Sequence, residues 1–316
     1  MKTLKLAQMK ILFVTGKGGV GKSTLSAAMA WQLSRQYRVL IVSLDPAHNL
    51  GDIFNMALKD KKTRYTDTLY LEEIDLKKLT KEYLQKEIDV LSKSYKYLQV
   101  LNLDNYFSVL KYSPGIEEYA LLTGIEKTIR DEKDFDYIVF DTPPTGLTLR
   151  FLALPRITIT WIERLITIRQ QILKKRYTIH RIRGSLSDSE TVLDYDEQKD
   201  RVLTRLNDLH RTYEDLNRKL QGPDTSITLV FNPDILSLKE SARLIEGLED
   251  LKLPLRLLIN NKVTDENIKM AKEVEGSMTS MVHNIPLERV PLAKGIFDEK
   301  TSTLYHIEKD ITRHFR

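Results

Sequence analysis

The stretch VTGKGGVGKSTLS at residues 14–26 decides the fold of this chain. Residues 16–23 within it fit G-x-x-x-x-G-K-[ST], the pattern of a phosphate-binding loop. The apolar run KILFVT at residues 10–15 precedes the loop, and apolar residues at helical spacing follow it over residues 22–36. The stretch therefore predicts a buried strand, a phosphate-binding loop and a helix in direct succession.

Each residue type in the loop has a physical reason to be there. Glycines permit the backbone angles and the close approach that let several N–H groups face one phosphate. Lys22 is expected to reach the β- and γ-phosphates, and the Ser23 hydroxyl is expected to bind Mg²⁺. Lys17, directly after the first glycine, is surplus to the general pattern and needs a separate explanation.

Further apolar runs predict a mainly parallel sheet. The runs are continuous rather than alternating, and helical segments such as residues 238–251 separate most of them. This pattern is typical of strands that are buried under helices on both faces. The predicted strands cover residues 38–44, 69–74, 136–141, 226–231, 255–260 and 282–285. The sequence therefore indicates a doubly wound α/β fold.

Polar residues end several of these strands. Asp45, Asp141 and Asn260 follow apolar runs, as the glycine loop does, and ligands of parallel sheets bind at the carboxyl ends of strands. Asp141 is the kind of acid that holds Mg²⁺, directly or through water, and Asp45 is a further candidate for the metal. Asp45 and Asp52 also flank the loop DPAHNLGD, where a carboxylate either orients an attacking water or caps a helix or turn.

Two regions without convincing strands interrupt this pattern. Residues 76–132 and 156–222 look helical, and we expect these insertions to form one helical subdomain. The nucleotide-binding domain then comprises residues 1–75, 133–155 and 223–316. Residues 183–196, rich in Gly, Ser and Asp, are expected to form a loop. The apolar residues predicted to share one helix face are Trp161, Leu165, Ile168, Ile172 and Leu173.

The composition limits the chemistry that is possible. The 316 residues are 41% hydrophobic, which is enough for a sizeable core, and none is cysteine. Disulfides, thiolate zinc sites and cysteine nucleophiles are therefore excluded. The net charge of +5 arises from mixed charges and selects no anionic partner, so nucleic acid is not expected to bind. Without a signal-peptide pattern or 18 consecutive apolar residues, the protein is expected to be cytoplasmic.

Three motifs together resemble one family. GKGGVGKS at residues 16–23 is the signature of a deviant phosphate-binding loop. SLDPAHNLGDIF at residues 43–54 resembles the first switch of the arsenite-pump and tail-anchored-protein-targeting ATPases, and DTPPTGLTLRFLALP at residues 141–155 resembles their second switch. Residues 232–248 and 257–261 resemble later segments of the same family, so the resemblance covers most of the chain.

The resemblance implies an ATPase with ATP and Mg²⁺ as its ligands. In this family the lysine that matches Lys17 crosses a dimer interface to the partner's nucleotide, much as an arginine finger does. By the same comparison, Asp52 polarises the attacking water and Asp141 supports Mg²⁺. Asn260 reads adenine, together with the stretch that begins at Pro286. The residues that hold the phosphates are Gly18, Gly19, Val20, Gly21, Lys22, Ser23 and Thr24.

The chain departs from the family pattern at several points. Pro143 and Leu147 replace the alanine and histidine of the usual second switch, and Leu147 can neither donate a hydrogen bond nor titrate. Without cysteine, the chain lacks the zinc ligands of the eukaryotic targeting factors and the metalloid ligands of the pump ATPases, so no zinc is expected. A single phosphate-binding loop, where the pump ATPases have two, implies a homodimer.

Three functional interpretations remain open at this point. In the first, ATP closes a homodimer whose helical subdomains bind a hydrophobic transmembrane helix of a tail-anchored or other client and deliver it to a membrane or receptor. In the second, the protein is a partitioning or positioning switch, which requires a basic patch or a membrane-binding helix. In the third, it is an ATP-dependent holdase chaperone. The apolar residues of the insertions either bind clients or pack into the subdomain's own core.

Overall fold

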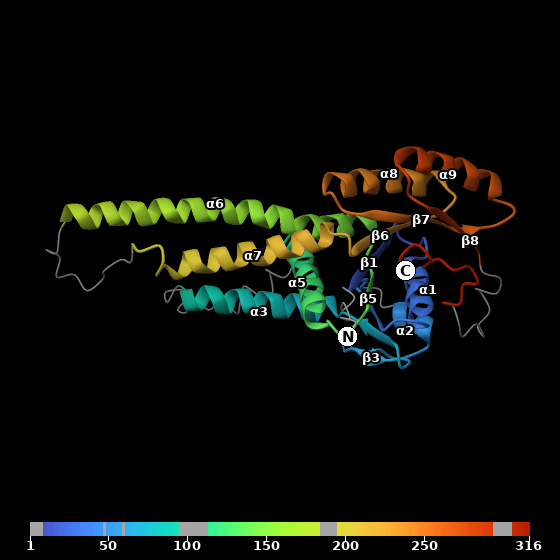
Figure 1. The fold of residues 1–316 in the computed structure, drawn as a ribbon, viewed down its shortest axis with the longest axis horizontal. Coiled ribbons are helices and arrows are strands. Elements are labelled where there is room, and N and C mark those ends of the chain that lie inside the picture. The colour runs from blue at the N-terminus through green and yellow to red at the C-terminus, as the bar shows by residue number, and fades with distance from the viewer. Residues whose placement is uncertain (1–8, 47–48, 59–60, 95–112, 184–194, 293–304) are drawn as a thin grey trace, which may run out of the picture. The chain divides into compact units, whose positions relative to one another are not determined.

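The computed structural model describes residues 9–46, 49–58, 61–94, 113–183, 195–292 and 305–316. Its eight-stranded sheet has the order β3-β4-β2-β5-β1-β6-β7-β8 (Figure 1), and all neighbouring strands run parallel except β3 and β4. The strands are β1 (Lys10–Gly16), β2 (Val39–Ser43), β3 (Thr63–Arg64), β4 (Leu69–Glu73), β5 (Tyr137–Asp141), β6 (Thr225–Phe231), β7 (Leu255–Val263) and β8 (Leu287–Pro291). The predicted mainly parallel α/β fold is confirmed.

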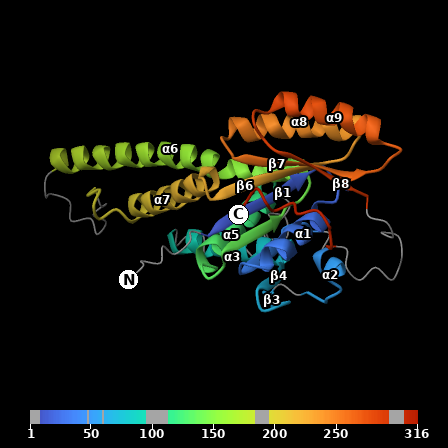
Figure 2. The same cartoon turned by 45° about the vertical axis from the view of Figure 1, so that its right-hand side comes forward.

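Helices cover both faces of the sheet. The helix α1 contacts β1, β2 and β5, whereas α8 and α9 contact β6 and β7, and Figure 2 shows these two groups of helices on opposite faces. The helices are α1 (Lys22–Ser34), α2 (Asn49–Phe54), α3 (Leu76–Ser94), α5 (Ile116–Asp131), α6 (Thr145–Arg183), α7 (Arg201–Gln221), α8 (Ile235–Asp250) and α9 (Ile268–Met281). This arrangement explains why the central strands are apolar along their whole length.

The register of the sheet aligns the carboxyl ends of its central strands. Asp141, the last residue of β5, pairs with Val14 of β1. Val230, near the end of β6, pairs with Gly16, the last residue of β1. The glycine loop after β1 and the turn after β5 therefore leave the sheet at the same edge, where ligands of such sheets bind.

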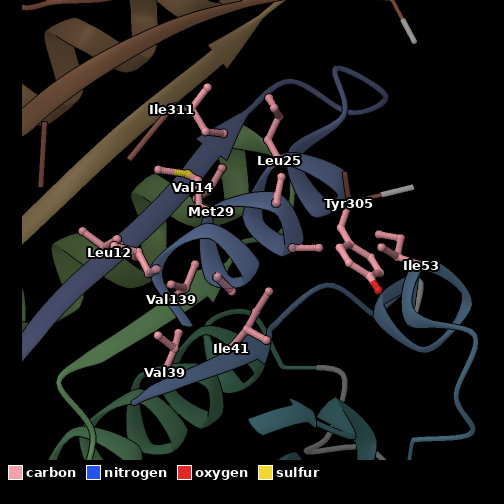
Figure 3. Close-up of a cluster of buried hydrophobic side chains, with 14 of the residues drawn as sticks. Leu12, Val14, Leu25, Met29, Val39, Ile41, Ile53, Val139, Tyr305 and Ile311 are labelled. Atoms are coloured by element: carbon pink, nitrogen blue, oxygen red, sulfur yellow. The ribbon is translucent and has the colours of Figure 1, made fainter. Parts of the chain in front are cut away.

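The core between α1 and the sheet includes the C-terminal segment, residues 305–316. The side chains of Tyr305, Ile311 and Phe315 in this segment are buried. Figure 3 shows part of the cluster: Leu12, Val14, Leu25, Met29, Val39, Ile41, Ile53, Val139, Tyr305 and Ile311. Burial of these large apolar side chains stabilises the position of α1 and, with it, the loop that precedes α1.

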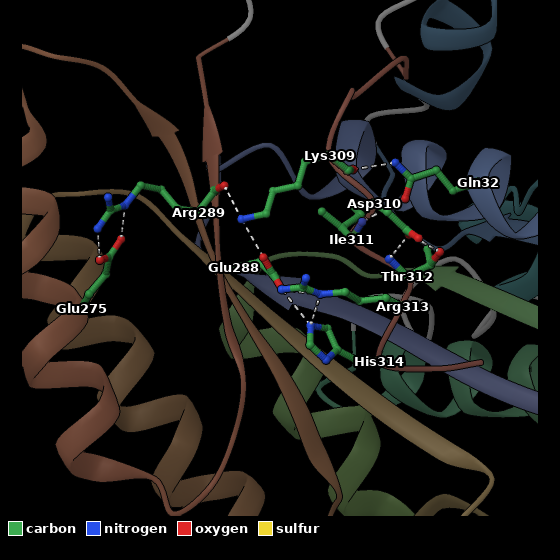
Figure 4. Close-up of polar contacts among 10 residues, drawn as sticks. All are labelled: Gln32, Glu275, Glu288, Arg289, Lys309, Asp310, Ile311, Thr312, Arg313 and His314. Carbon is green, nitrogen blue, oxygen red and sulfur yellow. Dashed lines mark hydrogen bonds and ion pairs between the residues drawn. The ribbon is translucent and has the colours of Figure 1, made fainter.

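A single glutamine of α1 binds the backbone of this C-terminal segment. The Gln32 Nε2 donates to the carbonyls of Ile307 at 3.1 Å and Lys309 at 2.8 Å. Its Oε1 accepts from the Ile311 N–H at 3.0 Å (Figure 4). All three contacts join residues far apart in sequence, so the C-terminal segment is part of the folded unit that carries the loop.

By its contacts the chain divides into two units, Met1–Leu152 with Gln221–Arg316, and Ala153–Leu220. The smaller unit corresponds closely to the second predicted insertion, residues 156–222. The helices α3 and α5 of the first predicted insertion, residues 76–132, belong by their contacts to the same unit as the sheet. The helix α5 buries Leu121 and Ile125 in that unit. A joint subdomain of both insertions thus stays a prediction.

One predicted strand is wrong and one predicted loop lies mostly outside the described residues. Residues 282–285 are not a strand; Val282 ends α9 and Asn284 has a φ of 56°, a left-handed conformation that interrupts extended chain. The last strand is β8, five residues further on. Of the predicted loop, residues 184–194 are not described. Among the described helices, none combines the length and the apolar character needed to cross a bilayer.

Glu288 on β8 links the sheet to the C-terminal segment. Its buried carboxylate pairs with Lys309 Nζ at 2.6 Å, with His314 Nε2 at 2.7 Å and with the guanidinium of Arg313 (Figure 4). Burial alone raises the pKa of this carboxyl, but the hydrogen bonds from Lys309, His314 and Arg313 outweigh burial and lower the pKa of Glu288 to about 2. The carboxylate is therefore stabilised as an anion.

Replacing this carboxylate is expected to destabilise the fold in a pH-dependent way. The pKa of Glu288 falls from 4.5 to about 2 on folding. The carboxylate therefore contributes fully to the free energy of unfolding above pH 4.5, and this contribution is lost as the pH falls towards 2. We expect Glu288→Gln to lower the free energy of unfolding by about 3 kcal/mol at neutral pH. Urea titrations should show the difference shrinking below pH 4.5.

The matched control is Glu249→Gln on the exposed side of α8. Its effect on the free energy of unfolding should be small at every pH. Equal losses in the two variants, or a loss in Glu288→Gln that does not change with pH, would contradict the account.

Candidate functional site

The phosphate-binding loop connects β1 to α1, as predicted. At two of its glycines the neighbouring atoms leave no room for a Cβ. Gly16 has a φ of 152°, and a Cβ there would collide with the carbonyl oxygen of Val230 in β6. Gly21 has a φ of 94°, and a Cβ there would collide with the side-chain amide of Asn261 at the end of β7. The neighbouring strands therefore determine the path of the loop.

Lys22, the first residue of α1, is buried beneath the loop. Its Nζ donates to the carbonyl of Lys17 at 3.2 Å, which folds the side chain back along the loop. Burial lowers the pKa of Lys22, and the charges of Asp141 and Asp45 oppose that shift. An ammonium held in this way is suited to bind phosphate oxygens of a nucleotide.

Asp141 is fully buried at the end of β5. Its Oδ1 accepts from the Ser26 hydroxyl at 3.2 Å, and its Oδ2 is buried with no hydrogen-bond partner among the described residues. Burial raises the pKa of Asp141 to about 6, although the Ser23 hydroxyl, Lys22 and Ser26 each favour the charged form. Ser26 was missed in the sequence analysis; its signal is its place one helical turn after Lys22.

Several buried polar atoms near the carboxyl edge of the central strands have no hydrogen-bond partner in the part of the chain that the structure describes. Five neighbouring strands each contribute one side chain with such an atom, in the carboxyl-terminal half of the strand or directly after it. These atoms are Thr15 Oγ1, Ser43 Oγ, Asp141 Oδ2, Asn232 Oδ1 and Asn260 Oδ1. Because buried polar atoms are nearly always hydrogen-bonded, this edge is suited to a polar ligand and ordered water.

The residues at this edge fit Mg²⁺. A hard cation takes carboxylate and hydroxyl oxygens, and the unpartnered Oδ2 of Asp141 with the nearby Ser23 hydroxyl offers both. Asp45 follows β2 and is half-exposed, close enough for its charge to act on Lys22 and Asp141. When bound, Mg²⁺ supplies positive charge that neutralises the phosphate oxygens.

The end of β7 contacts the loop through two residues that the sequence analysis missed. Asn261 Nδ2 donates to the carbonyl of Val20 at 2.8 Å, and Lys262 Nζ donates to the carbonyl of Gly19 at 2.6 Å. The predicted strand stopped at Asn260, whereas β7 continues to Val263. The signal that was available is an amide and a lysine at the carboxyl end of an apolar strand.

The two residues predicted to read adenine are not brought together. Asn260 is buried, and its Nδ2 donates to Glu275 Oε1 on α9 at 2.8 Å, away from the loop. Pro286 precedes β8, and its carbonyl accepts from the N–H of Leu258, two residues before Asn260. Pro286 therefore lies short of the carboxyl edge. Adenine recognition by these residues stays a prediction.

Asp52 and Lys17 lie at the surface of the same unit. The helix α2 buries Leu50 and Phe54, and its Gly51 N–H donates to Glu73 Oε1 at 2.9 Å, whereas Asp52 is exposed. The side chain of Lys17 is half-exposed and has no hydrogen-bond or ion-pair partner among the described residues. Both side chains are thus accessible to a ligand or another subunit.

The smaller unit is an antiparallel pair of helices, α6 and α7. Arg169 of α6 forms two hydrogen bonds, of 3.0 and 2.6 Å, with Asp200 directly before α7. Glu163, further back on α6, meets His210, further along α7. Hydrogen bonding to Arg169, with the N–H of Leu203, lowers the pKa of Asp200, so this ion pair stays charged and joins the two helices.

An apolar stripe runs along one exposed face of α6. Its residues lie three or four positions apart, with Lys175 in the single longer gap, so they follow one line along the helix. The stripe is Ile157, Trp161, Leu165, Ile168, Ile172, Ile179 and Ile182. Trp161 is 65% and Ile182 79% exposed, whereas Leu173, predicted to share this face, is 1% exposed and belongs to the core.

Asp141→Asn is expected to stabilise the nucleotide-free protein while removing its ATP hydrolysis. The pKa of Asp141 rises on folding from 3.8 to about 6, so burying its charge lowers stability fully above pH 6 and not at all below pH 3.8. The neutral amide avoids this penalty, and thermal unfolding above pH 6 should show a gain of up to about 3 kcal/mol. A loss of stability there, or undiminished hydrolysis, would refute the role of Asp141.

Comparisons with known proteins agree with the nucleotide site that the structure indicates. The model of the anion-transporting ATPase family matches residues 9–289. A protein of Aquifex aeolicus (strain VF5), assigned as arsenical pump-driving ATPase 2, is 31% identical over 283 residues, which are 87% of this chain and 89% of that protein. The ATPase GET3 of Candida tropicalis is 30% identical over 317 residues, 92% of this chain and 86% of the relative.

A third relative is longer than this chain. The ATPase ASNA1 homolog of Plasmodium falciparum is 32% identical over 267 residues, which are 83% of this chain but 65% of the relative. The family match includes the loop, both switch segments and the contacts of β7. The chain therefore belongs to the anion-transporting ATPase family, as its motifs predicted, and it is an ATPase.

Proposed function

We propose that this ATPase is a Mg²⁺-dependent homodimer that binds a hydrophobic transmembrane helix of a membrane protein and delivers it to a membrane or membrane receptor. The single observation that carries the proposal is the exposed apolar stripe of α6. The resemblance of residues 43–54 and 141–155 to the switches of tail-anchored-protein-targeting ATPases supports the same function.

The size of the stripe matches a transmembrane helix. From position 157 to position 182 the helix rises by about 38 Å at 1.5 Å per residue. A membrane-spanning helix needs about 20 residues, or about 30 Å. A client helix lying along the stripe could therefore contact it over a length similar to that of its own apolar segment.

The chemistry of the stripe also suits such a client. Seven large side chains, all Ile, Leu or Trp, are exposed in one line on a single helix. Exposed apolar side chains gathered on one helix face in this way mark an interaction site. The stripe contains no methionine, so adaptation to different clients depends on alternative packing of stiff side chains rather than on flexible ones.

The dimer is proposed from Lys17. Its backbone carbonyl accepts from Lys22, but its ammonium has no partner among the described residues. A lysine at the tip of a phosphate-binding loop can reach a second nucleotide only if another subunit brings that nucleotide to it. Closure around ATP would supply the partner, and a cation placed there stabilises charge that develops during hydrolysis.

Client binding is tested by co-expression with a membrane protein that has one C-terminal transmembrane helix. In an Asp52→Asn background, expected to bind ATP without hydrolysing it, purification with ATP and Mg²⁺ should yield a complex that needs both nucleotide and transmembrane helix. Replacing Leu165 and Ile168 by Asp should abolish capture, because two charges interrupt the stripe. Gln170→Asp, exposed on another side of α6, is the matched control.

The outcomes separate the interpretations. Capture of a client that lacks its transmembrane helix would favour the holdase chaperone. Equal capture by the Leu165/Ile168 variant and the Gln170 control would refute the role of the stripe. No capture by any variant, with ATP hydrolysis intact in the parent, would favour a nucleotide-driven switch.

The action of Lys17 across the dimer is tested by mixing two inactive variants. Lys17→Ala keeps its own phosphate site but supplies no lysine to its partner, and Lys22→Ala supplies Lys17 but binds no ATP productively. Mixed dimers should regain part of the ATP turnover that each variant lacks, because one site per dimer is complete. Turnover that stays absent after subunit exchange has been verified, or Lys17→Ala with parental turnover, would rule out action in trans.

A further inference from the structure

We propose that Lys262 is a positioning residue for the phosphate-binding loop, which it holds in the form that receives the phosphates. The inference rests on nucleotide binding at that loop and does not depend on the client. It concerns a side chain that no motif of the family singled out in the sequence. Three observations support the inference. They are the contacts of two consecutive residues with the loop, the backbone conformation of Lys262, and the hydrogen bonds that stabilise this conformation.

The contacts fix two successive peptide units of the loop. Lys262 Nζ binds the carbonyl of Gly19 and Asn261 Nδ2 binds the carbonyl of Val20. In a planar trans peptide the carbonyl and the following N–H point in opposite directions. The N–H groups of Val20 and Gly21 are therefore directed away from β7. Donors that are oriented before the ligand arrives need no reorganisation when it binds.

The backbone of Lys262 is held in an uncommon conformation. Its φ is 60°, in the left-handed region that few residues with a Cβ adopt. Asn267, which precedes α9, donates from Nδ2 to the Lys262 carbonyl at 3.0 Å, and its Oδ1 accepts from the Thr264 N–H at 2.8 Å. The hydrogen bonds of Asn267 therefore stabilise the turn that directs the Lys262 side chain towards the loop. This conformation places the side chain of Lys262 beside the loop.

The chain contains a matched control for this conformation. Lys252 has a φ of 55°, nearly the same as that of Lys262, but it lies before the start of β7, at the opposite end of the strand from the loop. Replacing either lysine by methionine keeps the stem and the backbone penalty while removing the ammonium. The two variants each remove one ammonium from a backbone of nearly the same φ, and of the two lysines Lys262 is the one whose ammonium binds the loop.

The experiment compares Lys262→Met, Lys262→Arg and Lys252→Met with the parent protein. Dissociation constants for Mg²⁺-ATP and for inorganic tripolyphosphate are measured by calorimetry, and thermal unfolding is measured without nucleotide. We expect Lys262→Met to bind ATP about tenfold more weakly, equivalent to about 1.4 kcal/mol, and to lose a similar factor for tripolyphosphate. Lys262→Arg should recover most of the affinity, and the unfolding temperature of Lys262→Met should match that of Lys252→Met.

Three results would overturn the proposal. Unchanged ATP affinity in Lys262→Met would show that the contact with Gly19 has no role in binding. If Lys262→Met bound ATP more weakly but tripolyphosphate as tightly as the parent protein, Lys262 would act on the nucleoside part of ATP and not on the loop. A lower unfolding temperature with unchanged affinity would make the lysine a stability residue. None of these measurements involves a client, so a failure of client capture leaves the inference intact.

Discussion

The burial of Asp141 beside Lys22 is the interaction on which the rest of the site depends. Removing a carboxylate and an ammonium from water carries a penalty of several kcal/mol per ion unless hydrogen bonds compensate for it. Here the pKa of Asp141 is raised and that of Lys22 lowered, and Oδ2 of Asp141 has no partner among the described residues. The folded sheet therefore maintains a site whose buried polar groups are suited to phosphate and a cation.

The scaffold that maintains this site is built around α1. Its first residue is Lys22, its next turn supplies Ser26, and its last turns bury Met29 and bind the C-terminal segment through Gln32. A rigid helix fixed at both ends holds a functional group more accurately than a loop does. The C-terminal segment, remote in sequence, thereby contributes to the geometry of the phosphate site.

The sequence predicted the features that follow from local patterns. Continuous apolar runs predicted the parallel strands, and the glycines and Lys22 predicted the loop, because periodicity and composition determine both. Contacts between distant segments were not predictable in this way. For Lys262 the nearby residues show only a polar strand end, and its bond to the loop depends on how β7 lies beside that loop. The ion pairs of Glu288 with the C-terminal segment have no signal in nearby residues, since the position of β8 in the sheet creates them.

The exposed face of α6 is another feature that the sequence predicted only in part. Spacing alone grouped Leu173 with Trp161 and Leu165, although it lies one position from the stripe and packs inwards. Helical periodicity identifies an apolar face, but two faces of one helix can both be apolar, and only packing against α7 distinguishes the buried from the exposed one. The stripe became visible once the burial of each residue was known.

The central claim is that Mg²⁺-ATP binds at the carboxyl edge of the sheet and completes the buried polar groups there. Backbone hydrogen exchange, measured with and without Mg²⁺ and a non-hydrolysable ATP analogue, tests it most directly. The account predicts slower exchange for the N–H groups of residues 18–24, with smaller changes after β5 and β7. Unchanged exchange in residues 18–24 at saturating nucleotide, or protection confined to α6 and α7, would contradict it.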